Sequence, residues 1–155
     1  MEDRSEIVID GGISLALPPD TRSTLTRAED QPDVRRFFPE GPAIYAVSVA
    51  ESTGSPEDAV GLAAGDIVYA YRRSENFSRT TRTAPQIPGA AFAMLLDFVW
   101  DDRNGVRMHS LVLVAGQPNR TVVVHGALPE LQGPGALEEM EATLLSCRLT
   151  DQPVG

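Results

Sequence analysis

The chain contains no lysine, so all 13 of its basic residues are arginine. The planar side chain of arginine can form two parallel hydrogen bonds to one partner, which lysine cannot. One interpretation of the exclusive use of arginine is therefore functional. Coding bias of a GC-rich bacterial genome is the simpler interpretation, because alanine, glycine, proline, valine and aspartate are also abundant. The absence of lysine therefore indicates the base composition of the genome rather than a functional site.

Cysteine and long apolar runs are also scarce. Cys147 is the only cysteine, which excludes an internal disulfide and a cysteine-rich metal site. No run of 18 apolar residues exists, so no transmembrane helix is predicted. The first residues, Met1 to Arg4, are acidic and lead directly into a strand pattern, unlike a secretory signal. We therefore expect a cytoplasmic protein with no membrane insertion.

Basic residues are outnumbered by 22 acidic ones, which gives a net charge of −9. Such a balance argues against nucleic acid and anionic membranes as partners. The 155 residues are 42% apolar, enough for a buried core. We expect one domain that spans residues 1–155.

Sequence patterns of known catalytic sites are missing as well. No serine lies in a Gly-x-Ser-x-Gly turn, and no phosphate-binding glycine motif occurs. His109 and His125 fall on neighbouring predicted strands, and with Asp97 they would form a two-histidine, one-carboxylate metal site if the strand register allowed it. Histidines on strands are far more often surface or hydrogen-bonded residues. We predict no catalytic residue, no metal and no cofactor.

The last third of the chain has the clearest pattern. It predicts three apolar strands, Phe92–Trp100, Val106–Ala115 and Thr121–Leu128, and a helix over Ala136–Arg148. Large side chains occupy one face of the first strand, and its other face is mostly apolar too. We therefore expect both sides of this strand to be covered.

An apolar stripe marks the predicted terminal helix. Leu137, Met140, Leu144 and Cys147 recur at helical spacing, which places them on one face. We expect this face to pack on the sheet. Cys147 then acts as a small buried hydrophobic residue rather than as a reactive thiol.

The first half predicts a hairpin, a strand and a capped helix. Glu6–Asp10 and Ile13–Leu17 form the hairpin, and Ala43–Ala50 forms the strand. Ser55 is a good helix N-cap, and Pro56 suits the first helical position.

Between this hairpin and this strand, the chain is polar and interrupted. Leu25 is predicted in a short edge strand. The Phe37-Phe38 pair is interpreted as a hydrophobic anchor beneath a loop, with an exposed aromatic contact for a partner as the alternative.

A long connection is predicted over Arg72–Pro88, and loops of this length are often functional or disordered. Solvated arginines are the simpler interpretation, and an anion- or partner-binding patch is the functional one. The candidate partner-binding residues are Arg72, Arg73, Phe77, Arg79 and Arg82.

The order of these elements resembles the Mog1/PsbP-like family. The opening "DGGISLALPPDTR" is followed by "AIYAVSVAES", then by the meander "MHSLVLVAGQPNRTVVVHGALPE" and the closing "LEEMEATLLSCRL". The resemblance implies an α+β fold, an α/β/α sandwich with a central antiparallel sheet flanked by helices. It also implies protein binding rather than catalysis, because members include a GTPase-binding protein, photosystem subunits, actinobacterial lipoproteins and chaperones of secreted effectors.

We therefore predict a non-enzymatic protein-binding module or adaptor of a bacterial cell, with an uncovered part of the sheet and the 72–88 segment as its surface. One alternative is a chaperone for a secreted effector or a secretion component. Another is a small-ligand binder or enzyme with a sheet–helix pocket near His109 and His125. The partner is expected to be another protein, and a homodimer is possible.

Overall fold

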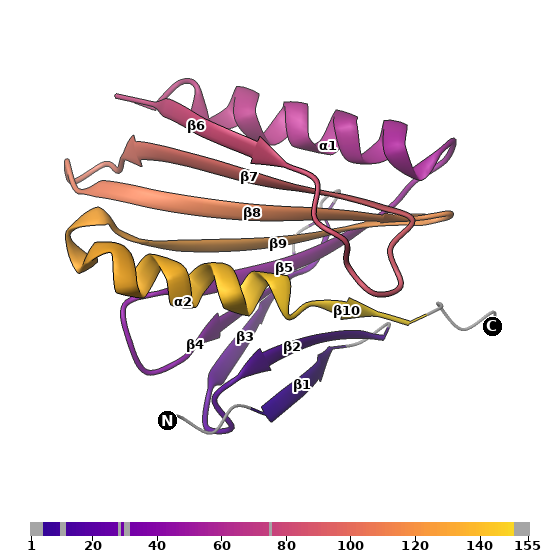
Figure 1. Ribbon diagram of the computed structural model, residues 1–155, viewed down its shortest axis with the longest axis horizontal. Helices are drawn as coiled ribbons and strands as arrows, with labels where there is room; N and C mark the ends of the chain where they lie inside the picture. Colours follow the sequence, from indigo (N-terminus) through magenta and orange to yellow (C-terminus); the bar gives the residue numbers. More distant parts are fainter. Residues whose placement is uncertain (1–4, 10–11, 28, 30–31, 75, 151–155) are drawn as a thin grey trace.

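The computed structural model describes residues 5–9, 12–27, 29, 32–74 and 76–150. A large antiparallel sheet of seven strands dominates it (Figure 1). In spatial order, its strands are β3 (Arg22–Thr26), β4 (Val34–Phe38), β5 (Ile44–Glu51), β9 (Arg120–Pro129), β8 (Arg107–Gln117), β7 (Phe92–Asp101) and β6 (Ser78–Thr83). A second sheet comprises β1 (Ser5–Ile9), β2 (Ile13–Leu17) and β10 (Arg148–Leu149).

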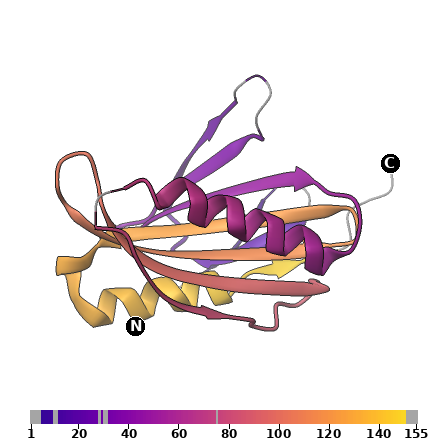
Figure 2. The same cartoon turned by 90° about the horizontal axis from the view of Figure 1, so that it is seen from above.

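One long helix lies against each face of the large sheet. Helix α1 (Pro56–Tyr71) packs on β7, β8 and β9, and Figure 2 shows it lying across them. Helix α2 (Gly133–Leu145) follows the short 3₁₀ helix η1 (Glu130–Gln132) and packs on β8, β9 and β2. The small sheet lies beside α2 and completes the cover on that side.

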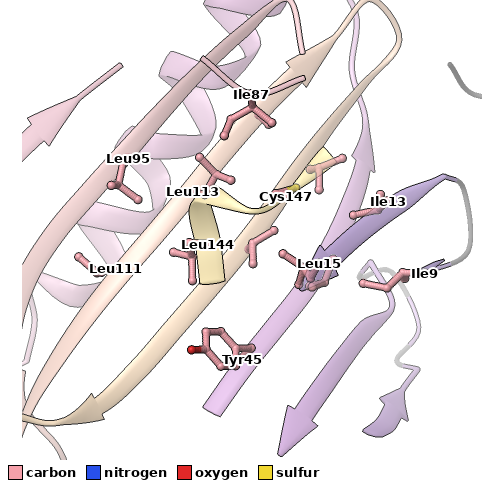
Figure 3. Close-up of a cluster of buried hydrophobic side chains, with 14 of the residues drawn as sticks. Ile9, Ile13, Leu15, Tyr45, Ile87, Leu95, Leu111, Leu113, Leu144 and Cys147 are labelled. Carbon is pink, nitrogen blue, oxygen red and sulfur yellow. The ribbon is translucent and has the colours of Figure 1, made fainter. Parts of the chain in front are cut away.

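Alternate residues of β8 show that the helices lie on opposite faces. Val112 and Val114 pack with Val60 of α1 in one buried cluster. Leu111 and Leu113 belong to a second, larger cluster on the other side of the sheet (Figure 3). Because successive side chains of a strand point to opposite faces, both sides of β8 are covered. The predicted cover on both sides of β7 is confirmed as well, since Leu96 belongs to the first cluster and Leu95 to the second.

The closing helix buries most of the stripe that the sequence predicts, and Cys147 is buried just after the helix ends. Met140, Leu144 and Cys147 are at most 1% exposed, and Leu137 packs against the same cluster. The helix begins at Gly133, three residues earlier than predicted, and ends at Leu145. The residues after it turn into β10, which pairs with β2.

Helix α1 begins as the sequence predicts. The Ser55 side chain accepts a hydrogen bond from the Asp58 backbone N–H at 3.1 Å, and Pro56 is the first helical residue. The predicted N-terminal hairpin is also present, as β1 and β2. It lies outside the main sheet, since β2 pairs with β10 rather than with a strand of the meander.

Two loop predictions are wrong. Residues 72–88 contain β6, an edge strand that pairs with β7 through a register shift between Arg79 and Thr81. The Phe37-Phe38 pair lies within β4 rather than beneath a loop, and Phe37 is 2% exposed in the core. Both strands are polar or interrupted by charge, which hides the alternation expected of a half-buried strand. Leu25 lies in the edge strand β3, as predicted.

Candidate functional site

Among the described residues, no helix covers part of the large sheet on the side where α1 lies. The strand register identifies the residues on this side. His125 contacts Tyr71 of α1 and pairs with Ala46 of β5. Ala46 pairs with Arg36 of β4, and Arg36 pairs with Thr24 of β3. These residues therefore share one face. We call this surface the open face. It comprises Arg22, Thr24 and Thr26 of β3, Val34, Arg36 and Phe38 of β4, and Ile44, Ala46, Ser48 and Ala50 of β5.

Burial agrees with this assignment. Ile44 is 47% exposed, although it lies in a strand next to the centre of the sheet. Its neighbours Tyr45 and Val47, which point to the opposite face, are 3% exposed and belong to the core. The same strand is thus buried on one side and open on the other.

The open face combines apolar and cationic side chains. The Arg36 Nη1 atom donates a hydrogen bond to Thr26 Oγ1 at 2.9 Å, which orients its guanidinium along the sheet. None of the ten residues of the open face is acidic. Residues 22–38 carry four arginines and three acidic residues, a net charge of +1, whereas the other nine arginines of the chain stand against 19 acidic residues. The open face is therefore a less acidic region of an acidic protein.

Of the five predicted partner-binding residues, the structure describes the side chains of Arg72, Arg73 and Phe77. Arg72 and Arg73 are exposed just after the last turn of α1. Arg73 donates to the Tyr69 hydroxyl at 3.1 Å, with its guanidinium carbon 5.1 Å from the ring centroid. Phe77 instead packs inward, 5.6 Å from the Phe98 ring. The side chains of Arg79 and Arg82 lie outside the described part of the structure.

The two histidines lie on opposite faces of the sheet. His109 pairs in register with Val99 and points to the α2 side, where its Nε2 atom is 2.6 Å from Asp97 Oδ1. His125 points to the α1 side and contacts Tyr71 and Phe98. The two histidines therefore cannot share a metal ion, and the alternative of a two-histidine, one-carboxylate site is wrong. Asp97 does contact His109, as that alternative required. Among the described residues, no group of three or more potential ligands could hold a metal ion.

A hydrogen-bonded chain surrounds His125 beneath the last turn of α1. Trp100 Nε1 donates to Ser110 Oγ at 2.9 Å, and Ser110 Oγ lies 3.1 Å from His125 Nε2. Because Ser110 accepts from the indole, its own proton is available for His125, whose other nitrogen lies 3.5 Å from the Tyr71 hydroxyl. Burial lowers the pKa of His125 from 6.5 to about 4 and raises the pKa of Tyr71. A neutral imidazole thus holds the end of α1 against the sheet.

Cys147 has no exposed surface, and burial raises its pKa to about 12. A thiol is nucleophilic as the thiolate, which this environment disfavours. The structure therefore supports its predicted role as a small hydrophobic residue of the core.

The sequence pointed only partly to the open face. The alternation of Ile44, Ala46 and Ser48 with larger residues predicts two faces for this strand, and its face of smaller side chains is the open one. Arg22 and Arg36 were missed, because their segment was interpreted as irregular.

Comparison with known proteins identifies the fold. No protein-family model matches the chain, and no curated protein sequence matches it. Solved structures do: cyanobacterial PsbP (CyanoP) from Synechocystis sp. PCC 6803 is 13% identical, with a TM-score of 0.68 over 97% of this chain and 94% of that one. The protein has the Mog1/PsbP-like fold.

Two further structures extend the comparison. LpqN of Mycobacterium tuberculosis, described as involved in cell envelope biogenesis, is 16% identical, with a TM-score of 0.62 over 96% of this chain and 91% of that one. PA94 of Pseudomonas aeruginosa, a protein of unknown function, is 16% identical, with a TM-score of 0.58 over 97% and 99%. Identities this low establish the Mog1/PsbP-like fold alone. Neither helix among the described residues is long and apolar enough to span a membrane.

Proposed function

We propose that this Mog1/PsbP-like protein is a non-catalytic protein-binding module, an adaptor of a bacterial cell, and that its partner docks on the open face. The observation that carries the proposal is the uncovered sheet surface around Ile44, which is 47% exposed, on the strand whose opposite face buries Tyr45 and Val47. An exposed apolar surface bordered by polar residues is typical of an interaction site.

The face is a better binding surface than the edges of the sheet. The edge strands β3 and β6 have the sequences RSTLT and SRTTRT, and charged, polar edges discourage pairing with another strand. The open face instead offers Val34, Phe38 and Ile44 together with Arg22 and Arg36.

The charge of the face favours a different protein over a second copy of this chain. A symmetric dimer through this surface would bring Arg22 and Arg36 towards the same arginines of the partner copy. It would also join two molecules of net charge −9. An acidic segment of another protein would instead complement the arginines, which favours association and selects against wrong partners.

The structural neighbours support a binding role. CyanoP, LpqN and PA94 are not described as enzymes. LpqN is described as involved in cell envelope biogenesis, so an envelope setting for our protein is as compatible with the proposal as the cytoplasm is.

The test compares the sets of proteins that wild type and each variant capture. Tagged wild-type protein, Ile44→Asp and the Arg22→Glu/Arg36→Glu pair would be used as bait in extract of the native cell, with quantitative mass spectrometry. Arg103→Glu is the matched control, because Arg103 is exposed in the β7–β8 turn, away from the open face. We expect one or more proteins that wild type and the control retain and both open-face variants lose. Identical capture by all four baits would contradict the proposal.

A further inference from the structure

The outer side of α1 is exposed along its whole length. Its inner side packs on β7, β8 and β9, and Figure 1 shows the helix as the outermost layer on its side of the sheet. Residues three, four and seven positions apart share one side of a helix. By this spacing, the residues opposite the buried Val60 and Ala64 form one strip, which we call the outer face of α1. It comprises Asp58, Leu62, Gly65, Asp66, Tyr69 and Arg73, all of them exposed.

Two large apolar side chains lie on this outer face. Leu62 is 72% exposed and Tyr69 is 58% exposed, two helical turns apart. Gly65 lies between them, and a Cβ at this position would meet no atom within 4 Å. The outer face is therefore an apolar surface with space at its middle, where the backbone of a second helix can approach closely.

The two ends of the outer face carry opposite charges. Asp58 lies in the first turn of α1, and Arg73 follows the last turn. The Arg73 Nη2 atom donates to the Tyr69 hydroxyl at 3.1 Å, and its guanidinium carbon lies 5.1 Å from the ring centroid, so Arg73 continues the same face. Neither Asp58 nor Arg73 forms an ion pair with another residue in the part of the chain that the structure describes. Each end therefore keeps a charge that another molecule can pair with.

These residues are arranged symmetrically about the middle of α1. Asp58 and Arg73 are equally distant in sequence from the midpoint between residues 65 and 66, and so are Leu62 and Tyr69. A second copy of α1, laid antiparallel on the first, therefore places Asp58 against Arg73 and Leu62 against Tyr69, each pair twice. A two-fold interface between identical chains requires this kind of self-complementary surface.

We propose that the outer face of α1 binds the outer face of a second copy of this chain, in an antiparallel two-fold dimer. A symmetric dimer through the open face would bring arginines together, whereas this one pairs each aspartate at position 58 with an arginine. Charges elsewhere on the two acidic molecules repel little at physiological salt, where the Debye length is about 8 Å. The inference concerns a different surface from the open face and does not depend on it.

The dimer is expected to be weak. The contact is confined to one helix about 24 Å long, and interfaces at the low end of the size range belong to transient complexes. The two copies of Asp66 also lie near the centre of the contact, where their like charges oppose association. We therefore expect a dissociation constant of about 10–1,000 μM.

Sedimentation equilibrium of the full chain, in about 0.15 M NaCl, measures this association. We expect the average mass to rise from one copy towards two between about 5 μM and 1 mM protein. Leu62→Glu should weaken the dimer about tenfold or more, because it removes a leucine that the dimer buries. The matched control is Leu131→Glu, at a residue 95% exposed on η1, which should leave the dimer unchanged. The mass of one copy at every concentration, or equal weakening by both variants, would overturn the proposal.

Charge reversals test the pairing of Asp58 with Arg73. Asp58→Arg and Arg73→Asp should each weaken the dimer about fivefold or more, because repulsion replaces two exposed ion pairs. Asp58→Arg also makes the net charge less negative, so general electrostatics alone would strengthen association rather than weaken it. A mixture of the two variants should restore the dimer, because both positions are then positive on one copy and negative on the other. A mixture that associates no more tightly than either variant alone would overturn the proposal.

The dimer and the open face can fail separately. Ile44→Asp changes the open face and should leave the dissociation constant of the dimer unchanged. Leu62→Glu should in turn capture the same proteins from cell extract as wild type. A wild-type chain that stays a single copy, together with a captured protein that Leu62→Glu loses, would overturn the dimer and assign the outer face of α1 to a different protein.

Discussion

Replacement of His125 by glutamine should make the protein less sensitive to acid. In the folded protein the pKa of His125 is about 4, because burial disfavours the charged imidazole, whereas an unfolded chain has the ordinary value of 6.5. Below pH 6.5 the unfolded chain therefore takes up a proton that the folded protein does not accept until about pH 4. Stability is fully present above pH 6.5 and falls as the pH drops towards 4.

The size of the effect follows from the two pKa values. Their difference corresponds to at most about 3 kcal/mol of unfolding free energy. His125 keeps some exposed surface, so we expect a loss of about 2 kcal/mol between pH 7.5 and pH 4.5. The glutamine variant has no titrating ring, and its amide retains hydrogen-bonding capacity toward Ser110 and Tyr71.

Urea unfolding followed by fluorescence of Trp100, the only tryptophan, measures this loss. Carboxylates also make the protein sensitive to acid, so the relevant quantity is the difference between wild type and His125→Gln at each pH. That difference should shrink by about 2 kcal/mol from pH 7.5 to pH 4.5. Parallel pH profiles of the two proteins, or an imidazole resonance of His125 that titrates near pH 6.5, would refute the reasoning.

Three further predictions concern stability and are measured by urea or thermal unfolding. Leu144→Ala should cost about 2–5 kcal/mol because Leu144 is completely buried, while Leu145→Ala, at a residue 40% exposed, should cost less than about 1 kcal/mol. Gly89→Ala should destabilise the protein by more than about 1 kcal/mol, because φ is +88° and a Cβ would collide with the backbone of β10. Its matched control, Gly61→Ala, places a Cβ in open space on α1 and should stabilise the protein by about 0.5–1 kcal/mol. Ser55→Ala should remove the N-cap of α1 and cost about 0.5–2 kcal/mol, and an unchanged midpoint would contradict that role.

The sequence predicts the elements whose signals are local. Ser55 and Pro56 start α1 where expected, and the stripe of Met140 and Leu144 is buried as expected. Caps and helical periodicity depend on residues close together in the chain, so they can be interpreted without knowing the topology. The three strands of the meander follow for the same reason.

Elements that depend on distant partners were missed. The strand β6 contains arginine, serine and threonine, and only its pairing with β7 makes it a strand. The hairpin of β1 and β2 was predicted, but its pairing with β10 depends on Arg148 and Leu149, more than 130 residues away. For the same reason, no local pattern could place His109 and His125 on opposite faces.

The open face exists because the sheet is wider than one helix can cover. Seven strands about 4.8 Å apart make a sheet about 29 Å wide, whereas one helix covers a band of about 10–12 Å. On the α2 side, the small sheet fills the remaining width with Ile13, Leu15 and Leu17, all at most 1% exposed. On the α1 side, none of the described elements covers β3, β4 and β5. The side chains of these strands on that side are mostly small or polar, and only Arg22 and Arg36 are charged. Phe38 and Ile44 form an apolar pair next to Arg22 on this uncovered surface, and this composition favours a surface that a partner covers.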